Sequence, residues 1–195
     1  MLPKPIQNLI DEFAKLPSIG PRQAARFVFH LLSQPKEEIE KFSKKIDEIK
    51  KITHCDFCNR VTESNVCEIC KDNNRDRTSI CLIEKDTDIE AIEKTKRYQG
   101  IYCILTENEK EQLKRLKKLI ERIKKSKKEL NEIVIATDAT TEGETIALYA
   151  QKQLEELKKI YPELKITRLG RGLSTGSELE YMDEDTLSNA FLGRK

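Results

Sequence analysis

The sequence is short of several residue types whose absence limits what the protein can be. Its 195 residues include no tryptophan and only two histidines, and aromatic residues make up 6% of the chain. No stretch approaches the roughly 20 consecutive apolar residues that a membrane-spanning helix needs, so we expect no membrane segment. The first residues lack the basic and then apolar order of a secretory signal. We therefore expect a cytoplasmic protein, in which thiols stay reduced.

A large excess of charge of one sign is also missing. The chain has 36 basic and 34 acidic residues, which gives a formal net charge of +2. Bulk charge therefore does not indicate a nucleic-acid partner. Binding to nucleic acid would need a local basic patch, or several copies of one in an oligomer.

Six cysteines are present, and four of them follow a metal-binding pattern. The spacing is Cys55-x2-Cys58-x8-Cys67-x2-Cys70. Two such pairs give zinc its preferred shell of four thiolates at roughly 2.3 Å. The alternatives are two unrelated turns or a redox site, but a redox site needs only one pair. We predict one structural zinc ion per chain, held in a compact knuckle.

The other two cysteines and one histidine have a different context. Cys81 and Cys103 each lie inside a short apolar run, where free cysteine packs as a small hydrophobe. His54 precedes the first zinc ligand, but four thiols already fill the shell. We expect the two cysteines in the core and the histidine outside the site.

Residues 1–53 have the apolar spacing of helices, interrupted by a turn at residues 16–21. We expect Gly20 to permit the tight turn and Pro21 to begin the next helix. The free N–H groups of that helix would attract a phosphate. Arg22 and Arg26 are four residues apart and would add contacts to a DNA backbone. The alternative is an ordinary helical hairpin with two solvated arginines. The pattern at residues 16–26 resembles the helix–hairpin–helix motif of DNA repair proteins, which implies that residues 1–53 form a DNA-binding unit.

Residues 79–170 alternate between short apolar runs and helical segments. Strands are expected at 79–83, 100–105, 132–136 and 165–169, and helices at 88–96, 107–128 and 141–160. This rhythm predicts a parallel sheet covered by helices. A last helix is expected at 184–192. The fold class is therefore α+β in several units: a helical unit at 1–53, the knuckle at 54–77, an α/β domain at 78–170 and a C-terminal segment at 171–195. We expect the C-terminal segment to take part in oligomerisation.

Four carboxylates are expected near one edge of this sheet. Glu84 and Asp138 follow the first and third strands, whose ends open on the same side. Glu142 and Glu144 lie at the start of the next helix. Converging carboxylates could hold Mg²⁺, while the alternative is that they only cap the helix.

The segment ATDATTEGE, residues 136–144, resembles the Asp-x-Asp-x-Glu-Gly-Glu signature of Toprim domains, and Glu84 matches the glutamate that ends their first strand. Thr140 stands where the signature has its second aspartate, and a hydroxyl is a poor ligand for Mg²⁺. We therefore expect a vestigial Mg²⁺ site or a partner contact rather than a catalytic centre.

The order of these parts, followed by Leu179-Glu180-Tyr181 near the C-terminus, resembles the RecR family of bacterial recombination proteins across the whole chain. The resemblance implies a non-catalytic DNA-binding accessory protein of recombinational repair. Such a protein acts with RecO, and with RecF where present, to load RecA at DNA gaps. Family members form dimers that associate into ring-like tetramers. The region Thr106–Leu130 departs from the family, because a charged helix replaces a Gly-rich loop.

Two other functions stay open at this point. One is a small metal-dependent Toprim nuclease, which would need the full acidic set. The other is a zinc-stabilised protein-interaction module without DNA contact.

Overall fold

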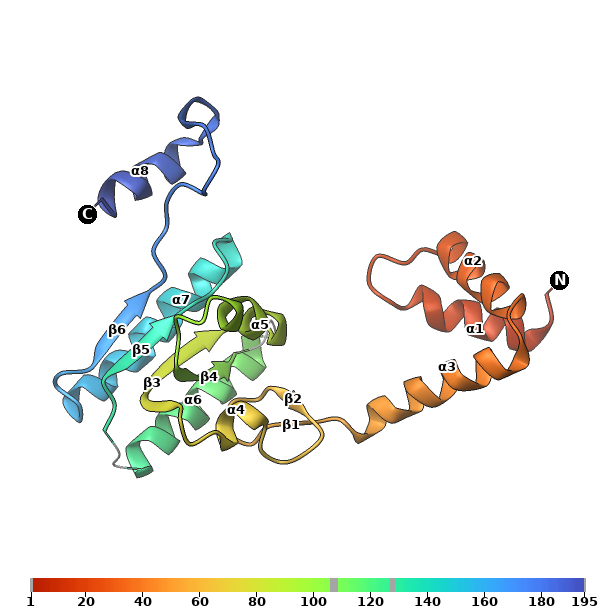
Figure 1. The fold of residues 1–195 in the computed structure, drawn as a ribbon, viewed down its shortest axis with the longest axis horizontal. Helices are drawn as coiled ribbons and strands as arrows, with labels where there is room; N and C mark the ends of the chain where they lie inside the picture. Colours follow the sequence, from red (N-terminus) through yellow and green to blue (C-terminus); the bar gives the residue numbers. More distant parts are fainter. Residues whose placement is uncertain (1, 106–108, 127–128, 195) are drawn as a thin grey trace. The chain divides into compact units, whose positions relative to one another are not determined.

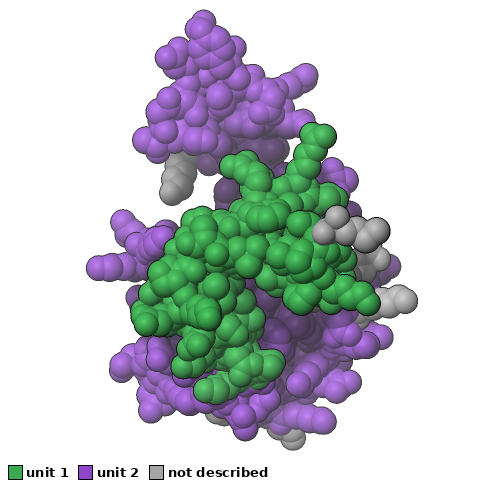
Figure 2. Space-filling view, turned by 90° about the vertical axis from the view of Figure 1, so that its right-hand side faces the viewer, with its two compact units in different colours: residues 1–52 green, residues 53–195 purple. Residues whose placement is uncertain are grey.

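The computed structural model describes residues 2–105, 109–126 and 129–194 (Figure 1). The chain forms two compact units, which Figure 2 shows in different colours. Unit 1 ends at Ile52 and unit 2 begins at Thr53. No helix in the described ranges is long and apolar enough to cross a membrane.

Unit 1 is a helical hairpin followed by a third helix. Its elements are α1 (Lys4–Ala14), α2 (Pro21–Leu32), α3 (Lys36–Glu48) and a 3₁₀ turn, η1 (Ile49–Lys51). The first two helices share a small core of Ile10, Ala24 and Val28. Phe13 and Phe27 pack edge to face, with ring centroids 6.0 Å apart. The apolar spacing thus gives the predicted helical N-terminal region.

The turn between α1 and α2 differs from the expectation in one respect. Ser18, not Gly20, adopts the left-handed conformation, with φ of 63°. Gly20 is extended (φ −83°, ψ 166°), and a Cβ added there would meet nothing within 4 Å. The prediction that Gly20 makes the tight turn was therefore wrong. A serine tolerates the left-handed region at some energetic cost, and the sequence offers no sign of that.

Unit 2 contains the cysteine segment, a sheet with its helices, and the C-terminal segment. The cysteine segment has β1 (Thr53–His54), β2 (Val61–Thr62) and α4 (Glu68–Lys71). The sheet and its connections are β3 (Asp76–Ile83), α5 (Asp86–Lys94), β4 (Gly100–Ile104), α6 (Glu109–Ser126), β5 (Glu132–Ile135), α7 (Thr141–Leu154), η2 (Glu155–Lys159) and β6 (Lys165–Arg168). The C-terminal segment has η3 (Leu179–Tyr181) and α8 (Glu184–Leu192).

The four long strands form a parallel sheet in the order β4-β3-β5-β6. The chain runs from β3 outward to β4 and then returns to pair β5 with the other side of β3. The carboxyl ends of β3 and β5 therefore flank the point where the strand order reverses, which is where open α/β sheets bind ligands.

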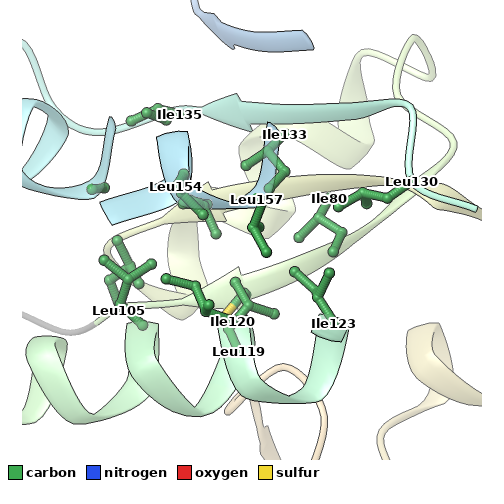
Figure 3. Packing of buried hydrophobic residues seen from close by; sticks show 14 of the residues in the cluster. Ile80, Leu105, Leu119, Ile120, Ile123, Leu130, Ile133, Ile135, Leu154 and Leu157 are labelled. Atoms are coloured by element: carbon green, nitrogen blue, oxygen red, sulfur yellow. The ribbon is translucent and has the colours of Figure 1, made fainter. Parts of the chain in front are cut away.

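Alternate side chains of the strands enter two cores. On one face, Ile80, Leu82 and Ile133 pack against helices α6 and α7. Figure 3 shows Leu119, Ile120 and Ile123 of α6 reaching toward the strands. On the other face, Cys81, Ile83 and Tyr102 pack with Ile89 of α5 and with the cysteine segment. The predicted fold class is confirmed: a helical N-terminal region, a four-cysteine cluster, a parallel sheet and a short C-terminal helix.

The strands and three of the helices differ from the expected bounds. β3 begins at Asp76, three residues earlier than expected, and β4, β5 and β6 each end one residue early. The helix expected at 107–128 spans Glu109–Ser126, and residues 106–108, 127 and 128 lie outside the described residues. The helix expected at 141–160 ends at Leu154 and continues as the 3₁₀ turn η2. Helix α5 begins at Asp86, two residues earlier than expected, because Asp88 caps it by accepting the N–H of Lys85 at 2.8 Å.

Candidate functional site

The four cysteines of the CxxC pairs come together as predicted from their spacing. All four are buried, with at most 7% of each residue exposed, and their sulfur atoms lie within 4.8 Å of one another. Sulfurs on a tetrahedral zinc ion are separated by about 3.8 Å, given Zn–S bonds of about 2.3 Å. The donor set and its spacing therefore fit one metal ion. Among the described residues, no other group of three or more His, Cys, Asp or Glu side chains is placed to hold one.

Local backbone contacts set the positions of these sulfurs. Asn59 has φ of 64°, and its N–H donates to the Cys55 carbonyl oxygen at 2.9 Å, which closes the first CxxC turn. Cys67 precedes α4, and its N–H donates to the Cys55 sulfur at 3.3 Å. His54 stays outside the cluster, because its Nδ1 lies 3.0 Å from the Asn59 carbonyl oxygen.

The electrostatics of the cluster favour a bound cation. Burial alone would raise the pKa of Cys55, but N–H groups of Cys58, Cys67 and Phe57 lower that pKa to about 7. Burial raises the pKa of Cys67 to about 11. The pKa of Cys58 is raised by its hydrogen bond with the Cys70 thiol and by burial. The raised pKa values of Cys58 and Cys67 mean that both thiols ionise readily only when a bound cation offsets the thiolate charge.

The cysteine segment is packed onto the sheet of unit 2. The Ile104 N–H of edge strand β4 donates to the Cys58 carbonyl oxygen at 2.8 Å. Arg77 of β3 donates to the Cys70 carbonyl oxygen at 3.0 Å. The cluster thus shields an open sheet edge, which is otherwise a site of unwanted strand pairing.

The acidic residues at the carboxyl edge of the sheet are arranged differently. Glu84 is buried, with 6% exposed, and its Oε1 accepts the Asp138 N–H at 2.8 Å. The Asp138 carboxylate turns outward to Lys85, whose Nζ lies 3.3 Å from Oδ2. β3 and β5 are adjacent as expected. However, Glu84 accepts a hydrogen bond from the loop after β5, and Asp138 forms an exposed ion pair with Lys85.

The remaining two glutamates also have other roles. The Glu144 carboxylate is bound by two guanidinium groups, those of Arg168 and Arg171, with one Arg168 contact of 3.0 Å. Glu142 is exposed and lines a cleft of about 530 Å³ between α6 and α7. The four carboxylates therefore do not gather around a common point in the described structure.

Thr140 and Gly143 explain the local shape of this edge. The Thr140 hydroxyl caps α7 by accepting the Gly143 N–H at 3.1 Å. A Cβ on Gly143 would lie 2.1 Å from the Asp138 carbonyl oxygen and 3.0 Å from Glu84 Oε1. Threonine thus serves as a cap where a metal ligand would be needed, and glycine allows the strand end and the helix to meet.

The hairpin residues predicted to bind DNA are on one helix in unit 1. Arg22 and Arg26 lie in the first two turns of α2 and are exposed. Within the described ranges, neither side chain forms an ion pair with a carboxylate. The first N–H groups of α2 have no side-chain cap, and Gly20 leaves the approach to them open. The arrangement suits a phosphate.

Sequence reasoning missed Arg168 and Arg171, which hold Glu144. Arg168 ends β6, the strand next to β5, so the order of strands brings it to the same edge as Glu144. The only signal in the sequence was its place at the end of an expected strand.

The buried Cys81 and Cys103 confirm the prediction of core positions, and burial raises the pKa of each thiol to about 12.

Comparisons with known proteins agree with this arrangement. Three family models match: "RecR, helix-hairpin-helix" at residues 6–50, "Toprim domain" at 79–169 and "RecR, C-terminal" at 172–195. The proteins named Recombination protein RecR of Staphylococcus aureus strains JH9 and Newman are each 39% identical over 206 residues. These alignments cover 98% of this chain and 97% of each relative.

Proposed function

The chain belongs to the RecR family of recombination proteins, and we propose that it is a non-catalytic DNA-binding accessory factor of recombinational repair. It would act in the cytoplasm with RecO, and with RecF where present, to help load RecA at DNA gaps. The observation that carries the DNA-binding part is the two exposed arginines at the open N-terminus of α2, neither of which pairs with a carboxylate of the described residues. Arg22 and Arg26 would contact phosphates and therefore bind without sequence preference.

The absence of catalysis is supported by the carboxyl edge of the sheet. A Toprim nuclease needs carboxylates that share Mg²⁺ ions for phosphodiester cleavage. Here Glu84 accepts a backbone N–H, and Glu144 is neutralised by two arginines. Thr140 supplies a cap and no charge. This edge is better suited to contact with a partner protein than to metal-assisted chemistry.

We assign zinc as the metal of Cys55, Cys58, Cys67 and Cys70. Four thiolates are the ligand set that zinc takes in closed structural sites, with no position left for a reacting water. When bound, the ion would supply only cross-linking of the knuckle and compensation of the thiolate charge.

Self-association is supported by apolar surface that no other described residue covers. Helix α3 has no buried residue, and its Phe42 and Ile46 are 41% and 50% exposed. Ile49 in the following turn η1 is 66% exposed. In the C-terminal segment, Tyr181 and Leu192 are 75% and 82% exposed. Exposed apolar groups of this kind mark interaction surfaces. We propose that further copies of the chain cover them, as in a dimer or a ring-like tetramer, so that several weak DNA sites act together.

Replacing both hairpin arginines with alanine tests the DNA-binding part. We expect the affinity of R22A/R26A for DNA to fall about tenfold or more at moderate salt. The reason is that each lost phosphate contact also removes released counterions, so the slope of log K against log salt should flatten by about 1–2. Fluorescence anisotropy with a labelled duplex and a labelled single strand, at several salt concentrations, measures both effects.

The control variant removes two exposed lysines from α3 of the same unit, K41A/K44A. It changes net charge by the same amount but leaves α2 intact, so its binding should stay within about twofold of the parent. Equal losses in both variants, or unchanged binding in R22A/R26A, would move the DNA site away from the hairpin.

A further inference from the structure

Helix α6 carries charge out of proportion to the rest of the chain. Its 18 residues include eight basic and three acidic side chains, a net charge of +5. The whole chain has a net charge of +2, so the remaining residues together carry −3. The basic residues are unevenly placed around the helix. Those at positions 115, 118, 122 and 125 follow i, i+3, i+7 and i+10 spacing, which puts them along one flank.

We call Arg115, Lys118, Arg122 and Lys125 the α6 stripe. At a rise of about 1.5 Å per residue it is roughly 15 Å long. It borders the cysteine segment, because Arg122 donates to the Asp56 carbonyl oxygen at 3.3 Å, and Arg115 lines a hollow together with His54. Lys118 and Lys125 are exposed, and neither forms an ion pair in the part of the chain that the structure describes. The stripe is therefore available to an anionic ligand.

An aromatic side chain and an apolar hollow lie beside the stripe. Phe57 is 47% exposed, and the Arg122 guanidinium stands 5.3 Å from the centre of its ring. Both residues border a pocket of about 150 Å³ that Arg77 also lines. The floor of the pocket is apolar and includes Ile80, Ile123 and Leu130, which lie together at one end of the core in Figure 3. An apolar cavity of about 150 Å³ is large enough for one six-membered aromatic ring.

We propose that the α6 stripe and this pocket form a binding site for single-stranded nucleic acid, separate from the hairpin of unit 1. The backbone phosphates follow Lys118, Arg122 and Lys125, and one unstacked base stacks on Phe57 with its six-membered ring directed into the pocket. Proteins that bind single strands combine these two elements, a basic track for the backbone and an aromatic face for a base. Duplex DNA fits less well, because its bases remain stacked inside the helix.

The charges around the pocket favour this ligand over a peptide. Arg77 and Arg122 use some of their N–H groups on backbone carbonyls, and no carboxylate pairs with either within the described residues. Glu129 is the acidic residue at the rim, and it is exposed to solvent. An acidic peptide with an aromatic residue would share part of this chemistry. Such a peptide does not require a row of basic side chains about 15 Å long, whereas the regularly spaced phosphates of a nucleic-acid strand match one.

The test uses the full-length protein and a labelled oligothymidylate, measured by fluorescence anisotropy. K118A/K125A is expected to bind the single strand at least about fivefold more weakly. The salt slope should fall by about 1.4, because each phosphate contact to a single strand contributes roughly 0.7. The control is K117A/K124A, which removes two lysines with the same seven-residue spacing from another face of α6, where Lys124 pairs with Glu156 at 3.3 Å. It should bind within about twofold of the parent.

Phe57 is tested with a base that reports stacking. A single strand containing 2-aminopurine should lose fluorescence on binding the parent and the F57Y variant, which keeps an aromatic ring. F57L should show a smaller loss and at least about fivefold weaker binding, as expected when a stacked base loses its platform. Zinc content is measured in each variant, so that a damaged knuckle is recognised.

Three results would overturn the proposal. The first is equal binding by K118A/K125A and the parent. The second is an equal loss in K117A/K124A, which would show that only the total charge of the helix matters. The third is a 2-aminopurine fluorescence change in F57L as large as that of the parent, with the zinc of F57L intact. The hairpin is judged separately, because repeating the titrations in the R22A/R26A background shows whether the two losses are independent.

Discussion

Replacing Cys67 with serine is expected to abolish stoichiometric zinc binding and to lower the stability of all of unit 2. The Cys67 sulfur lies 3.5 Å from that of Cys58, and serine offers only a weak oxygen ligand in its place. The loss of stability should extend to the sheet, because the carbonyl oxygens of Cys58 and Cys70 accept hydrogen bonds from strands β4 and β3. Loss of a structural metal ranks among the largest single-residue effects, about 4 kcal/mol or more. For a domain of this size, that lowers Tm by roughly 10 °C.

Elemental analysis of zinc and thermal unfolding followed by circular dichroism measure these effects. Cys103→Ala is the control, because Cys103 is a buried cysteine of β4 outside the cluster. It should keep about one zinc ion per chain and lose only the small contribution of one core side chain. A C67S protein that keeps the parent's Tm without zinc would show that the knuckle folds without its metal.

Gly143→Ala should destabilise unit 2 although alanine is the better helix former. Alanine in a helix is favoured over glycine by about 1 kcal/mol. Here the added Cβ would come within 2.1 Å of the Asp138 carbonyl oxygen, a backbone atom that cannot rotate away. Overpacking of this kind costs about 1–3 kcal/mol or more, so the steric cost should exceed the gain in helix propensity. We expect Tm to fall by several degrees.

Gly170→Ala in the same unit provides the comparison. A Cβ there meets nothing within 4 Å, so the change should be neutral or slightly stabilising. Thermal unfolding of both variants gives the difference. If G143A were as stable as G170A, the close approach of α7 to the end of β5 would not be the reason for glycine at this position.

Much of the architecture could be predicted because each element has its own local signal. The spacing of Cys55, Cys58, Cys67 and Cys70 is a chemical requirement of one tetrahedral ion, and the sulfurs do converge. Helix α8 has the predicted bounds, since Asp183 caps it by accepting the Thr186 N–H at 2.8 Å. The alternation of apolar runs and helices led to a parallel sheet, which the strand pairing confirms.

The contacts of the carboxylates at the carboxyl edge of the sheet could not be predicted from the sequence. Spacing places Glu84, Asp138 and Glu144 near one another, but the partner of each carboxylate depends on side chains that arrive from other strands and turns. Arg168 and Arg171 reach Glu144 only because β6 lies beside β5. The pocket beside Phe57 could not be predicted for the same reason, because its walls come from the cysteine segment, β3, β4 and α6. Sequence spacing says little about contacts between such distant segments.

We propose that this protein binds DNA without cutting it, and one titration tests both the binding and the absence of cleavage. An end-labelled gapped duplex is incubated with the protein and Mg²⁺. The bound fraction is read by gel shift, and strand lengths are read on a denaturing gel of the same samples. We predict binding that weakens in R22A/R26A, with every strand remaining at full length. Cleavage that requires Mg²⁺ and disappears in Glu84→Gln would contradict this account and indicate a Toprim nuclease.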